Sequence, residues 1–135
     1  MDNEHIKLAV IIKADKNKVK HALTTKNDIQ KWNTSNVNLQ DNILKLKYSN
    51  NIEFDWEIHE SNDDIIWKCV NGPKNAKNKE AIYSLEEIDN QTKVSLIHNN
   101  WELNDDEMSF CFARWGALLF SLKNYLEFNK PNLLF

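Results

Sequence analysis

Glycine and proline are scarce in this sequence of 135 residues, which contains two of each. With Gly72 and Gly116 as the only glycines, the chain has no phosphate-binding loop of the kinds that need several glycines at fixed spacing. The breaks between apolar runs are instead rich in asparagine and aspartate, as in the segments 49–51, 61–64 and 89–91. These residues tolerate positive φ and form local side-chain hydrogen bonds, so we expect them to make the turns.

An excess of basic residues is also missing, since the formal net charge is -3. This charge disfavours nucleic acid as a partner. The acidic start of the chain is unlike a secretory signal, and no apolar run approaches the roughly 20 residues that span a bilayer. We therefore expect a cytoplasmic protein without a membrane partner. In that compartment Cys69 and Cys111, the only two cysteines, are expected to be thiols.

The longest predicted element is a helix over residues 104–128. Apolar side chains recur there at spacings of three and four residues, which places them on one helix face: Cys111, Phe112, Trp115, Leu118, Leu119, Leu122 and Leu126. Asn104 with Glu107 is typical of a helix start, and Asn129 followed by Pro131 is typical of a helix end. Such a helix needs an apolar surface to cover it.

The rest of the chain is predicted to supply that surface. A strand over residues 6–12 comes first, followed by two short helices that begin near Asp15 and Thr25. Period-two alternation then predicts strands near 41–48, 52–60, 64–70, 80–88 and 92–101. A twisted antiparallel sheet curls, and the long helix fits its concave side. We predict one α+β domain over residues 1–135 with a helix-grip fold, in which about six strands wrap around the C-terminal helix.

Several segments share their order and spacing with a known family. They are Val19–Thr24, Ile29–Trp32, Thr92–His98 with Trp101, and Trp115–Glu127. In these segments the chain resembles the START-like (SRPBCC) superfamily and, within it, bacterial homologues of the activator of heat-shock protein 90 ATPase. One departure is Phe128-Asn129, where such proteins commonly have glycine. The resemblance implies a cavity between sheet and helix for apolar or amphipathic small molecules, and it implies no shared catalytic motif.

Aromatic and polar side chains are predicted to converge on this interior. The candidate ligand-contacting residues are Trp32, Phe54, Trp56, Leu96, His98, Trp101, Phe112 and Trp115. One polar group among aromatic walls is the usual composition of a small-ligand site. The alternative is that the rings pack a solid core. A void of about 300 Å³ or more would favour a hydrophobic small-molecule ligand, and a filled interior would favour a core.

Other functions remain open at this point. The resemblance also suggests a chaperone-related interaction protein, for which the apolar segment 132–135 and the polar loop 72–79 are the only visible candidate surfaces. Segment 132–135 is expected to fold back onto the domain. A cyclase or hydratase could use His98 as a general base with a pocket carboxylate or water. Separately, Cys111 and His98 could meet between helix and sheet as nucleophile and base, although a buried cysteine is more often a small apolar core residue. We identify no catalytic residue, metal site or cofactor motif, and we expect a monomer or a homodimer.

Overall fold

The computed structural model describes residues 3–49, 51–102, 105–130 and 133, without the side chains of residues 3 and 4. Helices and strands follow the predicted order. They are β1 (Asn3–Ile12), α1 (Lys16–Thr24), α2 (Lys26–Trp32), β2 (Asn36–Gln40), β3 (Ile43–Lys47), β4 (Glu53–Ser61), β5 (Asp64–Asn71), β6 (Glu80–Ile88), β7 (Gln91–Glu102) and α3 (Glu107–Phe128).

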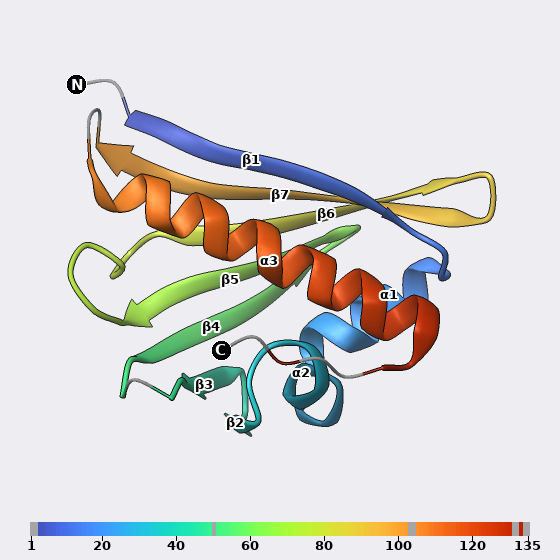
Figure 1. Cartoon of the computed structure of the whole chain (residues 1–135), viewed down its shortest axis with the longest axis horizontal. Coiled ribbons are helices and arrows are strands. Elements are labelled where there is room, and N and C mark those ends of the chain that lie inside the picture. Colours follow the sequence, from blue (N-terminus) through green and yellow to red (C-terminus); the bar gives the residue numbers. More distant parts are fainter. Residues whose placement is uncertain (1–2, 50, 103–104, 131–132, 134–135) are drawn as a thin grey trace.

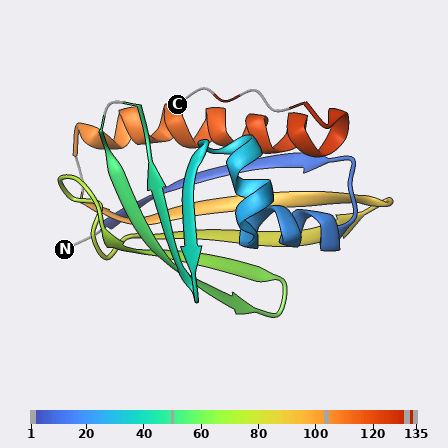
Figure 2. The same cartoon turned by 90° about the horizontal axis from the view of Figure 1, so that it is seen from below.

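All strands join one seven-stranded antiparallel sheet in the order β1-β7-β6-β5-β4-β3-β2. The first strand lies at one edge beside the last, where Ile12 pairs with Thr92 and Asn3 with Glu102. Figure 1 shows α3 crossing the sheet, with α1 and α2 grouped near one end, and Figure 2 shows the sheet curving beneath the helix. The predicted helix-grip fold is confirmed.

The sheet has one strand more than the about six predicted. The predicted strand 41–48 is the single strand β3, and β2 precedes it as its hairpin partner. In β2 only Val37 and Leu39 are apolar, between Asn36, Asn38 and Gln40, so its periodic signal is weak. Pairing with β3 provides the stability that the local sequence does not indicate.

Asparagine and aspartate make the turns, as predicted. Nine described residues have positive φ, and none of them is glycine: Asp41, Asn51, Asn62, Lys74, Asn78, Asp89, Asn90, Asn100 and Asn129. Most are in the tight connections between neighbouring strands, where a left-handed residue lets the chain reverse direction. Asparagine and aspartate adopt this conformation with less strain than other residues that carry a side chain.

The helix α3 begins three residues later than predicted, at Glu107. The predicted N-cap, Asn104, lies outside the described residues. Instead, Asp105 Oδ1 accepts a hydrogen bond of 3.0 Å from the backbone N–H of Glu107. The predicted end is confirmed, because Asn129 has φ 52° and its N–H donates to the carbonyl of Tyr125.

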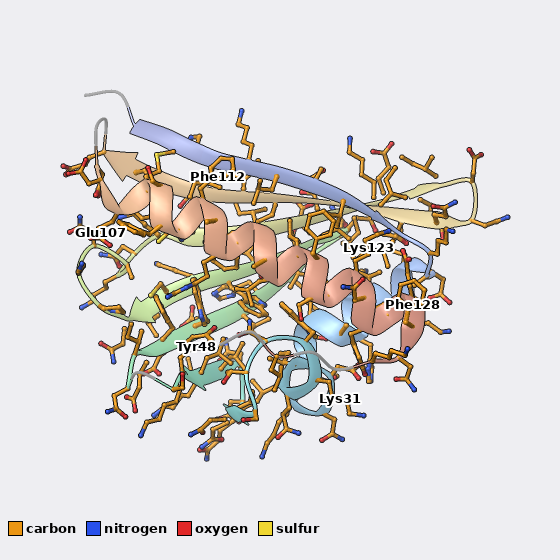
Figure 3. All side chains as sticks on the ribbon, viewed as in Figure 1. Lys31, Tyr48, Glu107, Phe112, Lys123 and Phe128 are labelled. Carbon is orange, nitrogen blue, oxygen red and sulfur yellow. The ribbon has the colours of Figure 1, made fainter. Side chains whose placement is uncertain are left out.

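The buried face of α3 differs from the prediction at both edges. It consists of Trp115, Leu118, Leu119, Ser121, Leu122 and Tyr125. Phe112 was predicted to face inward, but its side chain is 46% exposed. Figure 3 shows Phe112 on the β1 side of α3 and Tyr48 on the opposite side. Because Tyr125 and Ser121 belong to the buried face, that face is rotated away from Phe112. The predicted inward orientation of Phe112 is therefore wrong.

The orientation of β5, which the sequence left undecided, is settled by burial. Ile65, Trp67 and Cys69 are fully buried, whereas Ile66 and Val70 are half-buried. Within the described part of the chain, no helix is long and apolar enough to cross a membrane. The predicted fold-back of residues 132–135 falls mostly outside the described residues.

Candidate functional site

Aromatic rings fill the space between α3 and the concave face of the sheet. Trp56 on β4 is at their centre, with its ring centroid 5.8 Å from the centroids of Phe54 and Trp67. The ring of Trp115 on α3 lies 6.0 Å from Trp56, and Trp32 from α2 stacks on Trp67 at 6.1 Å. Ring pairs at such separations contribute about 0.5–1.5 kcal/mol beyond the area that they bury. This aromatic cluster therefore helps to fix α3 and α2 on the sheet.

His98 on β7 is a polar group inside the aromatic cluster, and it acts there as an acceptor. The indole Nε1 atoms of Trp101 and Trp115 both donate to His98 Nδ1, at 3.2 and 3.0 Å. Burial of the ring and, secondly, the positive charge of Lys79 lower the pKa of His98 to about 3. The imidazole is therefore neutral near pH 7 and has its proton on Nε2.

This geometry opposes the hypothesis that His98 is a general base. A base needs an available lone pair and a pKa near the working pH, whereas Nδ1 already receives two N–H groups. A Cys111–His98 pair is opposed too, because burial raises the pKa of the Cys111 thiol and the thiolate is the nucleophilic form. His98 satisfies two buried indole donors, which is a structural role.

The connection between β5 and β6 covers one end of the aromatic cluster. Lys79 is buried there, with its Nζ 4.7 Å from the centroid of the Trp101 ring and hydrogen-bonded to the carbonyl of Asn75. The same loop is bonded to the start of α3 by Lys74–Glu107 at 2.7 Å and by the Asn75 side chain on Asp105 at 2.9 Å. The loop 72–79 is thus fixed to the helix.

A small void remains inside the aromatic cluster, on the side of α3 that faces β3 and β4. Its volume is about 30 Å³, and its lining consists of Asn33, Leu46, Tyr48, Phe54, Trp56, Trp67, His98, Arg114, Trp115 and Leu118. This is far below the roughly 300 Å³ of an ordinary ligand pocket. By the volume criterion given for the sequence, the interior is therefore a packed core and not the open cavity that the resemblance implies, because the indole rings occupy that space.

One wall of this void has an unsatisfied hydrogen-bond donor. Asn33, the residue after α2, is 1% exposed, and its side-chain oxygen accepts a hydrogen bond of 2.5 Å from the Tyr48 hydroxyl. Its amide nitrogen Nδ2 is buried without a hydrogen-bond partner among the described residues. A buried donor left unpaired costs about 1–3 kcal/mol. Native cores contain few such groups, so this one requires an explanation.

Half-buried side chains separate the void from solvent. Tyr48, which follows β3, and Phe54 on β4 meet edge to face at 6.1 Å. The guanidinium carbon of Arg114 on α3 lies 5.9 Å from the centroid of the Tyr48 ring. We call these three residues the mouth. Because each is only partly buried, each can change rotamer with less loss of packing than a core residue.

The predicted site residues therefore divide into three groups. Phe54, Trp56, His98 and Trp115 line the void. Trp32, Leu96 and Trp101 are buried in the surrounding core but do not line it. Phe112 points outward. Sequence reasoning missed Asn33, Tyr48 and Arg114, which come from three separate parts of the chain, after α2, after β3 and within α3, and belong to no recognisable motif.

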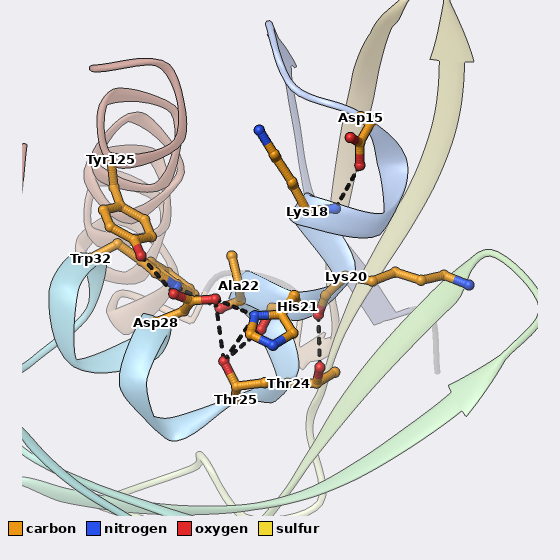
Figure 4. A network of polar contacts seen from close by, with 10 residues as sticks. All are labelled: Asp15, Lys18, Lys20, His21, Ala22, Thr24, Thr25, Asp28, Trp32 and Tyr125. Carbon is orange, nitrogen blue, oxygen red and sulfur yellow. Dashed lines mark hydrogen bonds and ion pairs between the residues drawn. The ribbon is translucent and has the colours of Figure 1, made fainter. Parts of the chain in front are cut away.

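A second polar cluster is centred on Asp28 (Figure 4). It lies beside an open surface groove of about 590 Å³ near the end of α3. The Asp28 carboxylate accepts from the Tyr125 hydroxyl at 2.6 Å and lies 2.6 Å from His21 Nδ1 and 3.3 Å from the Thr25 hydroxyl. Burial alone would raise the pKa of Asp28, but the hydrogen bonds from Tyr125 and His21 outweigh it and lower this pKa. The cluster ties α1, α2 and α3 together. The Thr25 hydroxyl lies 3.5 Å from His21 Nδ1, but it is also within 2.9 Å of the His21 backbone carbonyl, to which it donates. Among the described residues, no group of three or more His, Cys, Asp or Glu could hold a metal ion.

Comparison with known proteins places this architecture in a family. Residues 30–127 match the model of the family described as activator of Hsp90 ATPase homolog 1-like protein. The chain belongs to this family. A search of the curated proteins found no match.

Solved structures agree with this assignment. An Aha1 protein from Colwellia psychrerythraea, described as a dimer in solution, is 29% identical, with a TM-score of 0.83 over 94% of this chain and 98% of that one. Protein SSP2350 from Staphylococcus saprophyticus is 19% identical, with a TM-score of 0.76 over 98% of this chain and 100% of that one. The protein XoxI from Bacillus cereus is 15% identical, with a TM-score of 0.73 over 90% and 94% of the two chains. The last two likenesses concern the fold alone.

Proposed function

We propose that this member of the activator of Hsp90 ATPase homolog 1-like family binds a small amphipathic molecule between α3 and the β3–β4 side of the sheet, and that the molecule enters through the mouth. The observation that carries this proposal is the unpaired donor at Asn33, buried at the wall of the void. A purely structural core would gain about 1–3 kcal/mol by pairing or removing that group. A ligand atom that accepts from it would provide the missing partner.

The void of about 30 Å³ holds only a small part of such a molecule. The proposal therefore requires the mouth to widen, by rotation of the Arg114 side chain away from the Tyr48 ring. The packing of α3 is compatible with this movement, because the helix backbone approaches β1 and α2 most closely. On the β3–β4 side, long side chains rather than close backbone contacts bridge helix and sheet.

The test uses the tryptophan side chains as reporters. A thermal-shift screen with fatty acids, sterols and aromatic polyketides comes first, since a ligand at about 100 times its Kd adds roughly 2.7 kcal/mol of stability. Any hit is then titrated into labelled protein while the five indole N–H signals are followed by NMR. We expect the largest shifts at Trp56, Trp67 and Trp115, which line the void, and smaller ones at Trp32 and Trp101. A hit that leaves the first three unchanged would contradict this site.

A second function, contact with a chaperone ATPase, is favoured by the outer face of α3. Large phenylalanines there are exposed to solvent, with exposed fractions of 73% for Phe110, 46% for Phe112, 58% for Phe120 and 63% for Phe128. Several exposed phenylalanines along one helix offer apolar area for a protein contact. The family name and the 29% identical Aha1 protein suggest an Hsp90-class ATPase as the partner. Either function is expected in the cytoplasm, which stays a prediction.

This second function is tested by the ATPase rate of the source organism's Hsp90-class protein, measured with and without the present protein. We expect stimulation that Phe120→Ser abolishes and that Lys31→Gln, a change on the exposed side of α2, leaves intact. Sedimentation of the protein alone shows whether the face instead pairs two copies, as a homodimer would. Unchanged ATPase rates with the wild-type protein would exclude the activator function.

A further inference from the structure

Two polar side chains on the wall of the void carry hydrogen-bond donors that an anion could use. Asn33 contributes the unpaired Nδ2 donor, and Arg114 contributes a guanidinium that has only N–H donors and a permanent positive charge. The nearest hydroxyl, that of Tyr48, already donates to Asn33 Oδ1. Among the described residues that line the void, none is an aspartate or a glutamate. The remaining walls are aromatic or aliphatic.

We infer that the void receives the carboxylate head group of a small monocarboxylic acid, held by Asn33 and Arg114, while the apolar body of the acid lies against the aromatic rings of the mouth. This inference rests on the proposed function and specifies its ligand class. A carboxylate accepts from both donors at once, and charge-assisted hydrogen bonds of this kind are about twice as strong as neutral ones.

The size of the void agrees with a head group rather than a whole ligand. A volume of about 30 Å³ accommodates a few atoms, and the carboxylate is the smallest common anionic group of amphipathic metabolites. Behind it, Phe54 and Trp56 stack at 5.8 Å with 14° between their planes, and the two rings form a flat apolar wall. An alkyl chain or an aromatic ring fits against such a wall.

Other head groups suit this wall less well. An ammonium group would be repelled by Arg114 and would leave Asn33 Nδ2 without an acceptor. A neutral hydroxyl would accept from Asn33, yet it would lack the charge interaction with the guanidinium. The order of affinity expected for otherwise identical molecules is therefore carboxylate, then alcohol, then amine.

The experiment compares decanoate, decanol and decylamine, which share one alkyl chain and differ in the head group. Kd values are measured by NMR titration below the aggregation concentration of each probe, at pH 7.5. We expect decanoate to bind about tenfold to a hundredfold more tightly than decanol, since a hydrogen bond to a charged group is stronger than a neutral one by this factor. Decylamine is expected to bind weakest.

Three variants test whether Arg114 and Asn33 cause the preference for decanoate. Arg114→Gln should reduce the affinity for decanoate about tenfold and leave that for decanol nearly unchanged. Lys31→Gln removes the same charge from an exposed position on α2 and serves as the matched control (Figure 3). Asn33→Asp retains an acceptor for the Tyr48 hydroxyl but places a carboxylate at the void, so it should reverse the order and favour decylamine.

The outcomes separate the inference from the proposed function. Equal Kd values for decanoate and decanol, or an equal loss in Arg114→Gln and Lys31→Gln, would overturn the carboxylate assignment and leave binding itself standing. Absence of binding by all three probes at the void would overturn both. If a variant fails to fold, the wild-type protein still decides, because bound decanoate should shift the Asn33 side-chain amide signals and decanol should shift them less.

Discussion

Acidification from pH 7.5 to 5.0 should destabilise this protein through His98. The pKa of His98 is about 3 in the folded state, because burial disfavours the charged ring, and the ordinary value in an unfolded chain is about 6.5. Between these two values the unfolded chain binds a proton on this residue and the native protein does not. The free energy of unfolding therefore rises with pH between these two values, and acidification lowers it.

The magnitude follows from the same two values. The slope due to His98 approaches 1.4 kcal/mol per pH unit below pH 6.5, which amounts to about 2 kcal/mol between pH 7.5 and 5.0. Measurements stop at pH 5.0 because Asp28 and Glu127 have lowered pKa values, and they reduce stability only as their carboxylates are protonated in stronger acid. His5, His21 and His59 are exposed, and they remain in every variant as a common background.

The assay is urea-induced unfolding followed by tryptophan fluorescence at constant ionic strength, for the wild-type protein and His98→Leu. The variant should be less stable at every pH, because it leaves two buried indole N–H groups unpaired at about 1–3 kcal/mol each. Between pH 7.5 and 5.0, however, the free energy of unfolding of the variant should fall by about 2 kcal/mol less than that of the wild-type protein. Parallel profiles would refute the reasoning. Should the variant not fold, the ¹⁵N shifts of the wild-type His98 ring must still show a neutral Nε2–H form at pH 5.0.

Three further predictions concern single positions and are measured as free energies of unfolding. Trp115→Ala should cost about 3–5 kcal/mol, because it leaves a cavity in the aromatic cluster; an unchanged melting temperature would show that the ring is not packed. Gly72→Ala should destabilise by about 1–3 kcal/mol, since the added Cβ would lie 3.0 Å from Ala76 Cβ and 3.1 Å from Cys69 Sγ; Gly116→Ala, whose Cβ meets nothing within 4 Å, is the matched control and should not destabilise. Asn129→Gly should be nearly neutral at φ 52°, whereas Asn129→Val should cost about 1–2 kcal/mol; equal effects would contradict the left-handed helix end.

The fold was largely readable from the sequence, because hydrophobic periodicity determines which face of each element is buried. Alternation in β4 and β7 and the three-and-four spacing in α3 each specify a face, and only one arrangement covers all of them. The strand β2 was missed, because its two apolar residues give too weak a signal and its pairing with β3 is a tertiary effect.

The candidate site was less readable, because periodicity identifies a face but not what a side chain touches. Periodicity correctly predicted that Trp56, His98 and Trp115 lie close together. It could not show that two indole N–H groups donate to the same nitrogen of His98. The side-chain oxygen of Asn33 accepts a hydrogen bond from Tyr48, fifteen residues further along the chain, and the amide nitrogen is left unpaired. The local sequence around Asn33 does not indicate this contact. Phe112 shows the opposite error, since an apolar residue at the edge of a helical stripe can face either way.

The pairing of β1 with β7 has a consequence for how this chain folds. The register joins Ile12 to Thr92 and Asn3 to Glu102, so β1 has no neighbour in the sheet until its partner β7 has been synthesised. Contacts between such distant segments are formed against a large loss of chain entropy, and they slow folding. During synthesis β1 is therefore an unprotected edge, open to pairing with other chains. Pairing with β7 then occupies one side of β1, and the other side stays an edge of the folded sheet.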